Sequence, residues 1–353
     1  MDFNIIDLKY NDRIRNLDIK AKGKVKSEKN FPVFCIDNKE YIFKPLSKSK
    51  PFCTPCFAFS EVYWSNIINK YFDNKAPIYR LSICDDYEKN QSKYRNQGTI
   101  VPNLINEKQK LVNLLEYFRN NNDKNVDINN YINYCGKYYD YTCIFNSKLI
   151  EDNIFLGEEL AKQVLISILK VDTNYHYENV NFLFEEGNLK NLAAPIDHEF
   201  SSLFMYPDNN GLFLLNINPF INTLQNDIKA EEYITNNIEC ILNNINLIVE
   251  RYPNIVKEFI NNINNLLKDI DSLNIIFDER YLYPFSSFDF EEYKKEENYS
   301  KIYNPKYKKQ LLNIKEYFNK IKIYTIIVSL LLEKLLTKKI EEENNIKKII
   351  KKP

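Results

Sequence analysis

Apolar and polar residues alternate in short runs through the first hundred positions of the chain. Two such runs, 31–36 and 41–44, flank the pair Asp37-Asn38, and apolar runs on both sides of an Asp-Asn turn are typical of a β-hairpin. Later in this part, apolar residues recur once at helical spacing and then return to strand-like runs. The further elements expected here are a helix at 59–71 and strands at 77–84 and 98–101.

Beyond position 105 the apolar residues recur at three- and four-residue spacing, which predicts amphipathic helices packed on a core. The expected helices are 108–120, 156–169, two within 222–267 broken near Tyr252-Pro253, and one or two within 307–336. The whole pattern predicts an α+β fold with a β-rich N-lobe at 1–104 and a mostly helical C-lobe at 105–353. With 353 residues, the chain is long enough for each lobe to have its own core.

Composition and charge narrow the classes of partner. The chain has 48 basic and 48 acidic residues, so no overall field attracts it to nucleic acid or to an anionic membrane. The longest apolar run, 323–332, is about half the length needed to span a bilayer, and the first residues do not resemble a signal peptide. Seven cysteines without regular spacing suit a reducing compartment, so we expect a cytoplasmic protein.

Candidate chemistry is concentrated in one region, which also holds both histidines of the chain, His176 and His198. Here a loop with His176 and Asn179 leads into an apolar strand, a turn at 186–188, and then Asp197 at the end of a second short strand. Such a hairpin presents the amide oxygen of Asn179 and the carboxylate of Asp197 together. Mg²⁺ prefers hard oxygen ligands and shares them with nucleotide phosphates, so the sequence predicts a magnesium–nucleotide site here.

The order of these residues, His-x-x-Asn followed by an apolar strand and Pro-x-Asp, resembles the C-terminal half of HipA-like serine/threonine kinases, including the shorter CtkA-type members. The resemblance covers roughly residues 20–205. It implies a two-lobed protein-kinase-like fold that binds ATP and Mg²⁺ between the lobes. It further implies that Asn179 and Asp197 are the metal ligands and that His176 orders the loop.

Several segments upstream extend the resemblance, and residues 98–102 resemble the segment just past the family's hinge. Lys44, at the end of a strand that continues into Pro45, matches the lysine that contacts ATP phosphates, and Glu61 matches the glutamate that pairs with it. The lysine-rich segment around Gly23 lies where the family has a loop over the phosphates, although a solvated turn explains it equally well. Ser27 in this segment corresponds to a serine that is autophosphorylated in some relatives.

One position departs from the family pattern. The family's catalytic Asp corresponds to Asn174, and an amide does not accept a proton from a substrate hydroxyl at neutral pH. Asp172 is nearby, but two residues of backbone span roughly 6–7 Å, so it replaces the missing base only if the loop is reshaped. Loss of a general base costs on the order of 10²–10⁴-fold in rate. A slow kinase, a kinase that uses Asp172, and a nucleotide-binding pseudokinase all stay open.

The resemblance predicts transfer of the γ-phosphoryl group of ATP to a Ser or Thr hydroxyl of a protein substrate. A pseudokinase that binds nucleotide and displays a surface for a partner is the first alternative. A lipid or small-molecule kinase is the second, because phosphoinositide kinases have a similar loop. Some family members are restrained by an antitoxin-like partner and others act as secreted effectors, and the sequence leaves both open. We expect no direct nucleic-acid or membrane partner.

Overall fold

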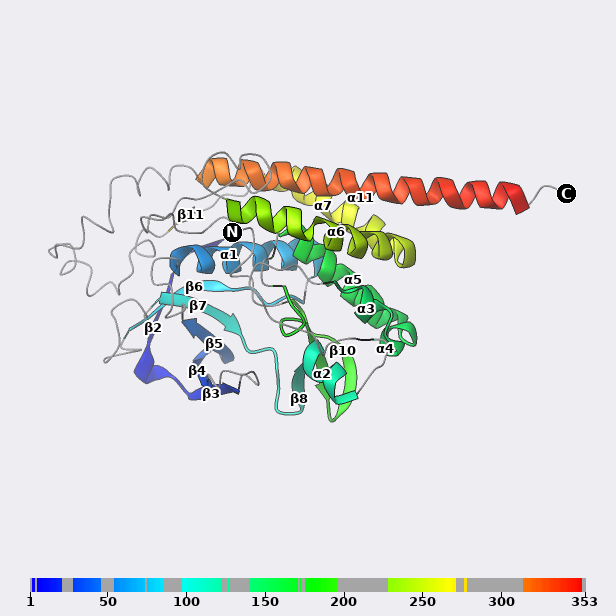
Figure 1. The fold of residues 1–353 in the computed structure, drawn as a ribbon. Helices are drawn as coiled ribbons and strands as arrows, with labels where there is room; N and C mark the ends of the chain where they lie inside the picture. The colour runs from blue at the N-terminus through cyan, green and yellow to red at the C-terminus, as the bar shows by residue number, and fades with distance from the viewer. Residues whose placement is uncertain are drawn as a thin grey trace.

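The computed structural model describes residues 2–3, 5–20, 28–45, 54–73, 75–85, 97–121, 126, 140–170, 172, 175–195, 228–270, 276–277 and 314–350. Strands gather in the N-terminal part and helices in the C-terminal part (Figure 1). This confirms the predicted α+β class, with a β-rich first part and a mostly helical second part.

A mixed six-stranded sheet forms the N-terminal part (Figure 1), with strand order β2-β6-β7-β5-β4-β3. Neighbouring strands are antiparallel except for β2 and β6, which are parallel. The strands are β2 (Ile6–Lys9), β3 (Arg15–Lys20), β4 (Glu28–Ile36), β5 (Lys39–Pro45), β6 (Arg80–Asp85) and β7 (Gln97–Pro102).

The turn between β4 and β5 confirms the predicted hairpin. Asp37 and Asn38 have φ angles of 50° and 59°, and positive φ at both central residues matches the backbone of a tight hairpin turn. Asp and Asn adopt this conformation more readily than most other residues. The turn sets the register of β5, and β5 carries Lys44.

Helix α1 (Thr54–Ile67) covers one face of the sheet (Figure 1) and continues into a π-helical turn, η3 (Ile68–Phe72). The helix begins earlier than the predicted position 59, and its apolar residues Val62, Trp64 and Ile67 are buried as the spacing predicts. The helix is buried on most sides, because it lies between the sheet and the C-terminal helices.

A second sheet of three strands, β8 (Gln109–Asn113), β9 (Asn181–Glu185) and β10 (Asn188–Leu192), lies beside the helical part (Figure 1). The predicted helix at 108–120 is wrong in its first half, since residues 109–113 pair with β9 and only α2 (Leu114–Asn121) is helical. The predicted hairpin after position 180 is confirmed, with Glu186 and Gly187 at φ angles of 50° and 83° in its turn.

The helical part is built on α5 (Ile154–Leu169), which is buried along most of its length and matches the predicted helix at 156–169. Helices α6 (Ile228–Arg251) and α7 (Pro253–Asp269) meet at Tyr252-Pro253, where the sequence predicts a break. Helix α11 (Ile314–Ile350) is one helix that extends well beyond the predicted end at 336. The remaining elements are α3 (Thr142–Phe145), α4 (Lys148–Glu151) and a short parallel pair, β1 (Asp2–Phe3) with β11 (Ile276–Phe277).

The main core extends through both parts of the molecule. Buried residues of α1, including Trp64, belong to one apolar cluster with residues of α5, α6, α7 and α11. In η3, Phe72 packs on Phe259 with ring centroids 4.8 Å apart, and Tyr71 donates a hydrogen bond of 2.7 Å to Asp269 of α7. A separate small cluster of buried residues, which includes Phe43 and Ile100, is formed by strands of the six-stranded sheet.

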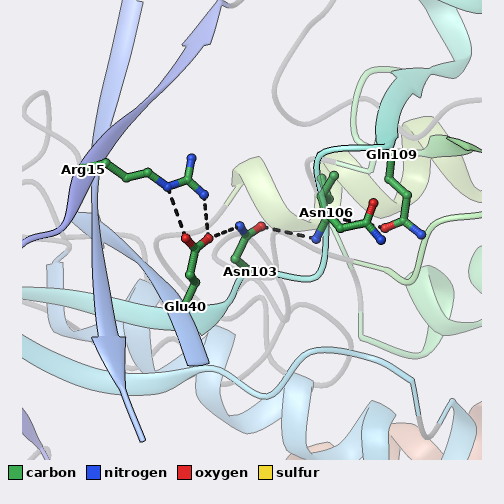
Figure 2. A network of polar contacts seen from close by, with 6 residues as sticks. Arg15, Glu40, Asn103, Asn106 and Gln109 are labelled. Atoms are coloured by element: carbon green, nitrogen blue, oxygen red, sulfur yellow. Dashed lines mark hydrogen bonds and ion pairs between the residues drawn. The ribbon is translucent and has the colours of Figure 1, made fainter. Parts of the chain in front are cut away.

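A polar network joins the sheet to the connection between β7 and β8 (Figure 2). The guanidinium of Arg15 donates two hydrogen bonds to the carboxylate of Glu40, of 3.3 and 2.5 Å, and the Asn103 amide donates a third of 2.8 Å. These hydrogen bonds, first that of Arg15 and then that of Asn103, lower the pKa of Glu40. At the other end of the connection, the carbonyl of Lys108 accepts a hydrogen bond from the Glu186 N–H in the β9–β10 turn.

The connection therefore contacts both sheets, and the predicted lobe boundary at 104/105 falls within it. That boundary stays a prediction. Within the described residues, no helix is both long enough and apolar enough to cross a membrane.

Candidate functional site

Lys44 and Glu61 form an ion pair between the six-stranded sheet and α1. The Nζ atom of Lys44 lies 2.5 Å from Oε1 of Glu61. The Glu61 side chain is only 2% exposed, whereas that of Lys44 is 21% exposed. The pairing predicted from the sequence is thus present, and it leaves part of the lysine side chain accessible to a ligand.

A third side chain completes this cluster. The hydroxyl of Thr99 on β7 donates a hydrogen bond of 2.7 Å to Oε2 of Glu61, so each carboxylate oxygen accepts one of the two contacts. Thr99 is opposite Lys44 in the pairing of β5 with β7, which brings both residues to the same place on α1. A buried carboxylate costs free energy unless it is paired and hydrogen-bonded, and here both conditions hold.

The loop after α5 begins with a second buried ion pair. Lys170 follows the last residue of the helix, and its Nζ lies 2.6 Å from Oδ2 of Asp172, with both side chains 2% exposed. The Asp172 N–H also donates to the carbonyl of Ser167, which fixes the backbone at the start of the loop. Asp172 therefore stabilises the loop in this conformation, and its burial argues against the role of substitute proton acceptor considered from the sequence.

His176 orders the next part of the loop through its own turn. Its side chain is buried, and its Nδ1 accepts a hydrogen bond of 3.2 Å from the N–H of Glu178. Its carbonyl accepts a second one, of 2.9 Å, from the N–H of Asn179. These contacts lie within the loop that the sequence predicts His176 to order, and the loop-ordering role itself stays a prediction.

Asn179 lies at the end of this turn, half-buried, and its carbonyl accepts a hydrogen bond of 3.3 Å from the Asn181 amide at the start of β9. Among the described residues, no three His, Cys, Asp or Glu side chains form a group that could hold a metal ion. The predicted magnesium ligands are an Asn and an Asp, which are the hard oxygen donors that Mg²⁺ prefers. Asn179 fits that donor set, and Asp197 lies outside the described residues.

Two residues of α5 hold the end of β10, which leads towards Asp197. The carboxylate of Glu159 accepts a hydrogen bond of 2.9 Å from the Leu192 N–H, and the Gln163 amide donates one of 2.6 Å to the Ala193 carbonyl. Burial raises the pKa of Glu159. The positions at 159 and 163 are one helical turn apart, so both side chains reach the same strand end.

Comparisons with known proteins give a similarity in structure and none in sequence. The chain is similar to a solved structure described as a Helicobacter pylori proinflammatory kinase, CtkA, with 15% sequence identity and a TM-score of 0.48. The match covers 96% of this chain and 99% of that chain. At this identity and TM-score the likeness carries no statement about activity. No protein-family model matches the chain, and no curated protein matches it.

Several candidate residues lie outside the described part of the chain, and their predicted roles stay predictions: Gly23, Ser27, Asn174 and Asp197. Conversely, the structure assigns contacts to Thr99, Glu159, Gln163 and Lys170, which the sequence pattern does not single out. For Glu159 and Gln163 the spacing along one helix face is a usable signal. For Thr99 the only signal is its register opposite Lys44, which becomes visible once the strands are paired.

Proposed function

We propose that the chain is an ATP- and Mg²⁺-dependent serine/threonine protein kinase of the HipA/CtkA type. The single observation that supports this best is the contact of Lys44 with the buried Glu61. A lysine whose ammonium is held in place by a buried carboxylate, and whose side chain is still partly exposed, is suited to bind phosphate oxygens as a point charge. An ordinary surface lysine has no such buried partner.

The other candidate residues have complementary roles in this proposal. Asn179 and Asp197 would hold Mg²⁺, which neutralises charge on the phosphates when bound. His176 keeps the loop that carries Asn179 in one conformation. The γ-phosphoryl group leaves the bridging oxygen of ATP and forms a bond to a Ser or Thr hydroxyl oxygen, whose proton is released. Asn174 does not take up that proton, so the reaction is expected to be slow.

A thermal-shift titration with ATP and Mg²⁺ tests the binding step. A ligand at about 100 times its Kd stabilises a protein by about 2.7 kcal/mol, which raises the Tm of a chain of this size by roughly 4 °C. We expect this shift for the wild type, and a much smaller one for Lys44→Ala and Asp197→Ala. The matched control is Lys108→Ala, since Lys108 forms an exposed ion pair with Glu186 and should leave the shift unchanged. Equal shifts for wild type and Lys44→Ala would contradict the proposal.

A nucleotide-binding module without transferase activity is the second candidate. It is favoured by the burial of Asp172 against Lys170, because the nearest carboxylate to position 174 in sequence is then engaged elsewhere. The substitution Asn174→Asp separates the two candidates. If the module reading is right, only the variant transfers phosphate from labelled ATP to a protein hydroxyl, while both proteins bind nucleotide equally. Measurable transfer by the wild type supports the slow kinase.

The substrate class and the location follow from the same proposal. We infer a protein substrate rather than a lipid, because the net charge of zero gives no attraction to anionic vesicles. Phosphorylation of lipid in vesicles, without transfer to protein, would favour the lipid-kinase alternative. An antitoxin-like partner and a cytoplasmic location remain part of the proposal.

A further inference from the structure

Thr99 lies on β7, directly opposite Lys44 of the paired strand β5. Its hydroxyl lies 2.7 Å from Oε2 of Glu61, and its side chain is buried. The other carboxylate oxygen, Oε1, accepts the 2.5 Å contact from Lys44. Lys44 and Thr99 come from paired strands, so the carboxylate of α1 is held from two neighbouring strands at once.

The two contacts differ in stiffness. The lysine reaches Glu61 through a long flexible side chain, whereas threonine is β-branched and has restricted rotation about its first side-chain bond. A hydrogen bond to a charged acceptor is also stronger than one between neutral groups. The hydroxyl of Thr99 therefore fixes the orientation of the Glu61 carboxylate, and that orientation decides where the Lys44 ammonium is held.

We propose that Thr99 is a positioning residue that sets the affinity for the phosphates of the nucleotide by holding Glu61 in the orientation that fixes Lys44. This inference rests on the proposed function, since it concerns the phosphate contact of Lys44. Thr99 itself need not touch the ligand. Its loss should weaken the recognition of phosphates and leave the recognition of the nucleoside largely unchanged.

The test compares the Kd for ATP·Mg²⁺ with the Kd for adenosine, each measured by calorimetry on the full chain. In Thr99→Val, which keeps the shape and removes the hydroxyl, we expect the affinity for ATP·Mg²⁺ to fall about tenfold, as for the loss of a hydrogen bond to a charged group. The affinity for adenosine, which has no phosphates, should change less than about twofold. Thr99→Ser restores a hydroxyl and should recover most of the affinity for ATP·Mg²⁺.

Ser82→Ala is the matched control for the loss of a buried hydroxyl in the same sheet. Ser82 lies on β6, next to β7. Its hydroxyl donates a hydrogen bond of 2.8 Å to the carbonyl of Ile6 and not to Glu61. Ser82→Ala should lower the Tm and leave the ratio of the ATP and adenosine affinities as in the wild type. If Thr99 has only a structural role, Thr99→Val should likewise lower the Tm and leave the ratio of the ATP and adenosine affinities unchanged.

The outcomes separate this inference from the proposed function. If the wild type binds ATP·Mg²⁺ and Lys44→Ala weakens that binding, but Thr99→Val does not, the positioning role of Thr99 is wrong and the proposed function stands. If Thr99→Val weakens ATP and adenosine equally, the positioning role is also wrong. If the wild type does not bind ATP·Mg²⁺, the proposed function fails and the inference fails with it.

Discussion

Asp172→Ala is expected to destabilise the protein by about 3–5 kcal/mol, because it leaves the ammonium of Lys170 buried without this carboxylate. For a chain of this size the change corresponds to a fall in Tm of roughly 4–7 °C. Thermal unfolding of the wild type and the variant measures it. Asp152→Ala is the matched control, since Asp152 is exposed at the end of α4 and its loss should change the Tm by about 1 °C or less.

The double variant Lys170→Met, Asp172→Leu sharpens this prediction. Replacing both members of a buried ion pair by apolar residues of similar size is often neutral, so the double variant should be clearly more stable than Asp172→Ala. It also lacks the Asp172 carboxylate while keeping the fold. Phosphoryl transfer at the wild-type rate by the double variant would exclude Asp172 as the base. A fall in Tm of Asp172→Ala no greater than that of Asp152→Ala would contradict the stabilising role of the pair.

Gly98→Ala is expected to destabilise the protein by about 3 kcal/mol and, under the proposed function, to weaken ATP binding at the same time. A Cβ atom at position 98 would lie 2.3 Å from the carbonyl oxygen of Lys44 and 2.8 Å from a ring carbon of Phe43. The nearest atom belongs to the backbone of the paired strand, so a side-chain rotation does not relieve the clash. Strand β5 must shift, and Lys44 shifts with it.

Urea unfolding and the ATP titration check the two effects of Gly98→Ala separately. Gly187→Ala is the control, because Gly187 has a φ of 83° but open space around its Cβ position. Alanine in that left-handed conformation costs about 1 kcal/mol, and ATP binding should not change. If Gly98→Ala retains wild-type stability and affinity, the close approach of β7 to β5 does not fix the position of Lys44.

Local chemistry made parts of this fold predictable. The turn at Asp37-Asn38 and the turn at Glu186-Gly187 contain residues that accept positive φ, and both hairpins form where the sequence predicts them. The break between α6 and α7 follows from Pro253, which begins the second helix at a position where its missing N–H costs nothing. Each of these signals lies within a few residues of chain.

The wrong predictions have different physical origins. Residues 109–113 have apolar spacing that fits a helix, but pairing with β9 makes them a strand, and the pairing is not visible in their own pattern. Helix α11 continues beyond 336 because helix-forming charged residues, with pairs such as Lys338–Glu342, extend it after the apolar stripe ends. The contact of Lys44 with Glu61 was predictable from family resemblance. The contact of Thr99 with Glu61 is predictable only once the register of β5 and β7 is known.

The packing of α1 has a consequence for how the proposed kinase activity could be controlled. A kinase whose glutamate-bearing helix swings outward can be switched off by separating the glutamate from its lysine. Here Trp64 shares one apolar cluster with the C-terminal helices, and Phe72 and Tyr71 contact α7 directly. An outward swing of α1 would expose this shared surface to water, at a cost of about 25 cal/mol for each Å² of apolar area. The ion pair should therefore persist with or without nucleotide, and control would have to act on substrate access or on the loop that carries Asn179.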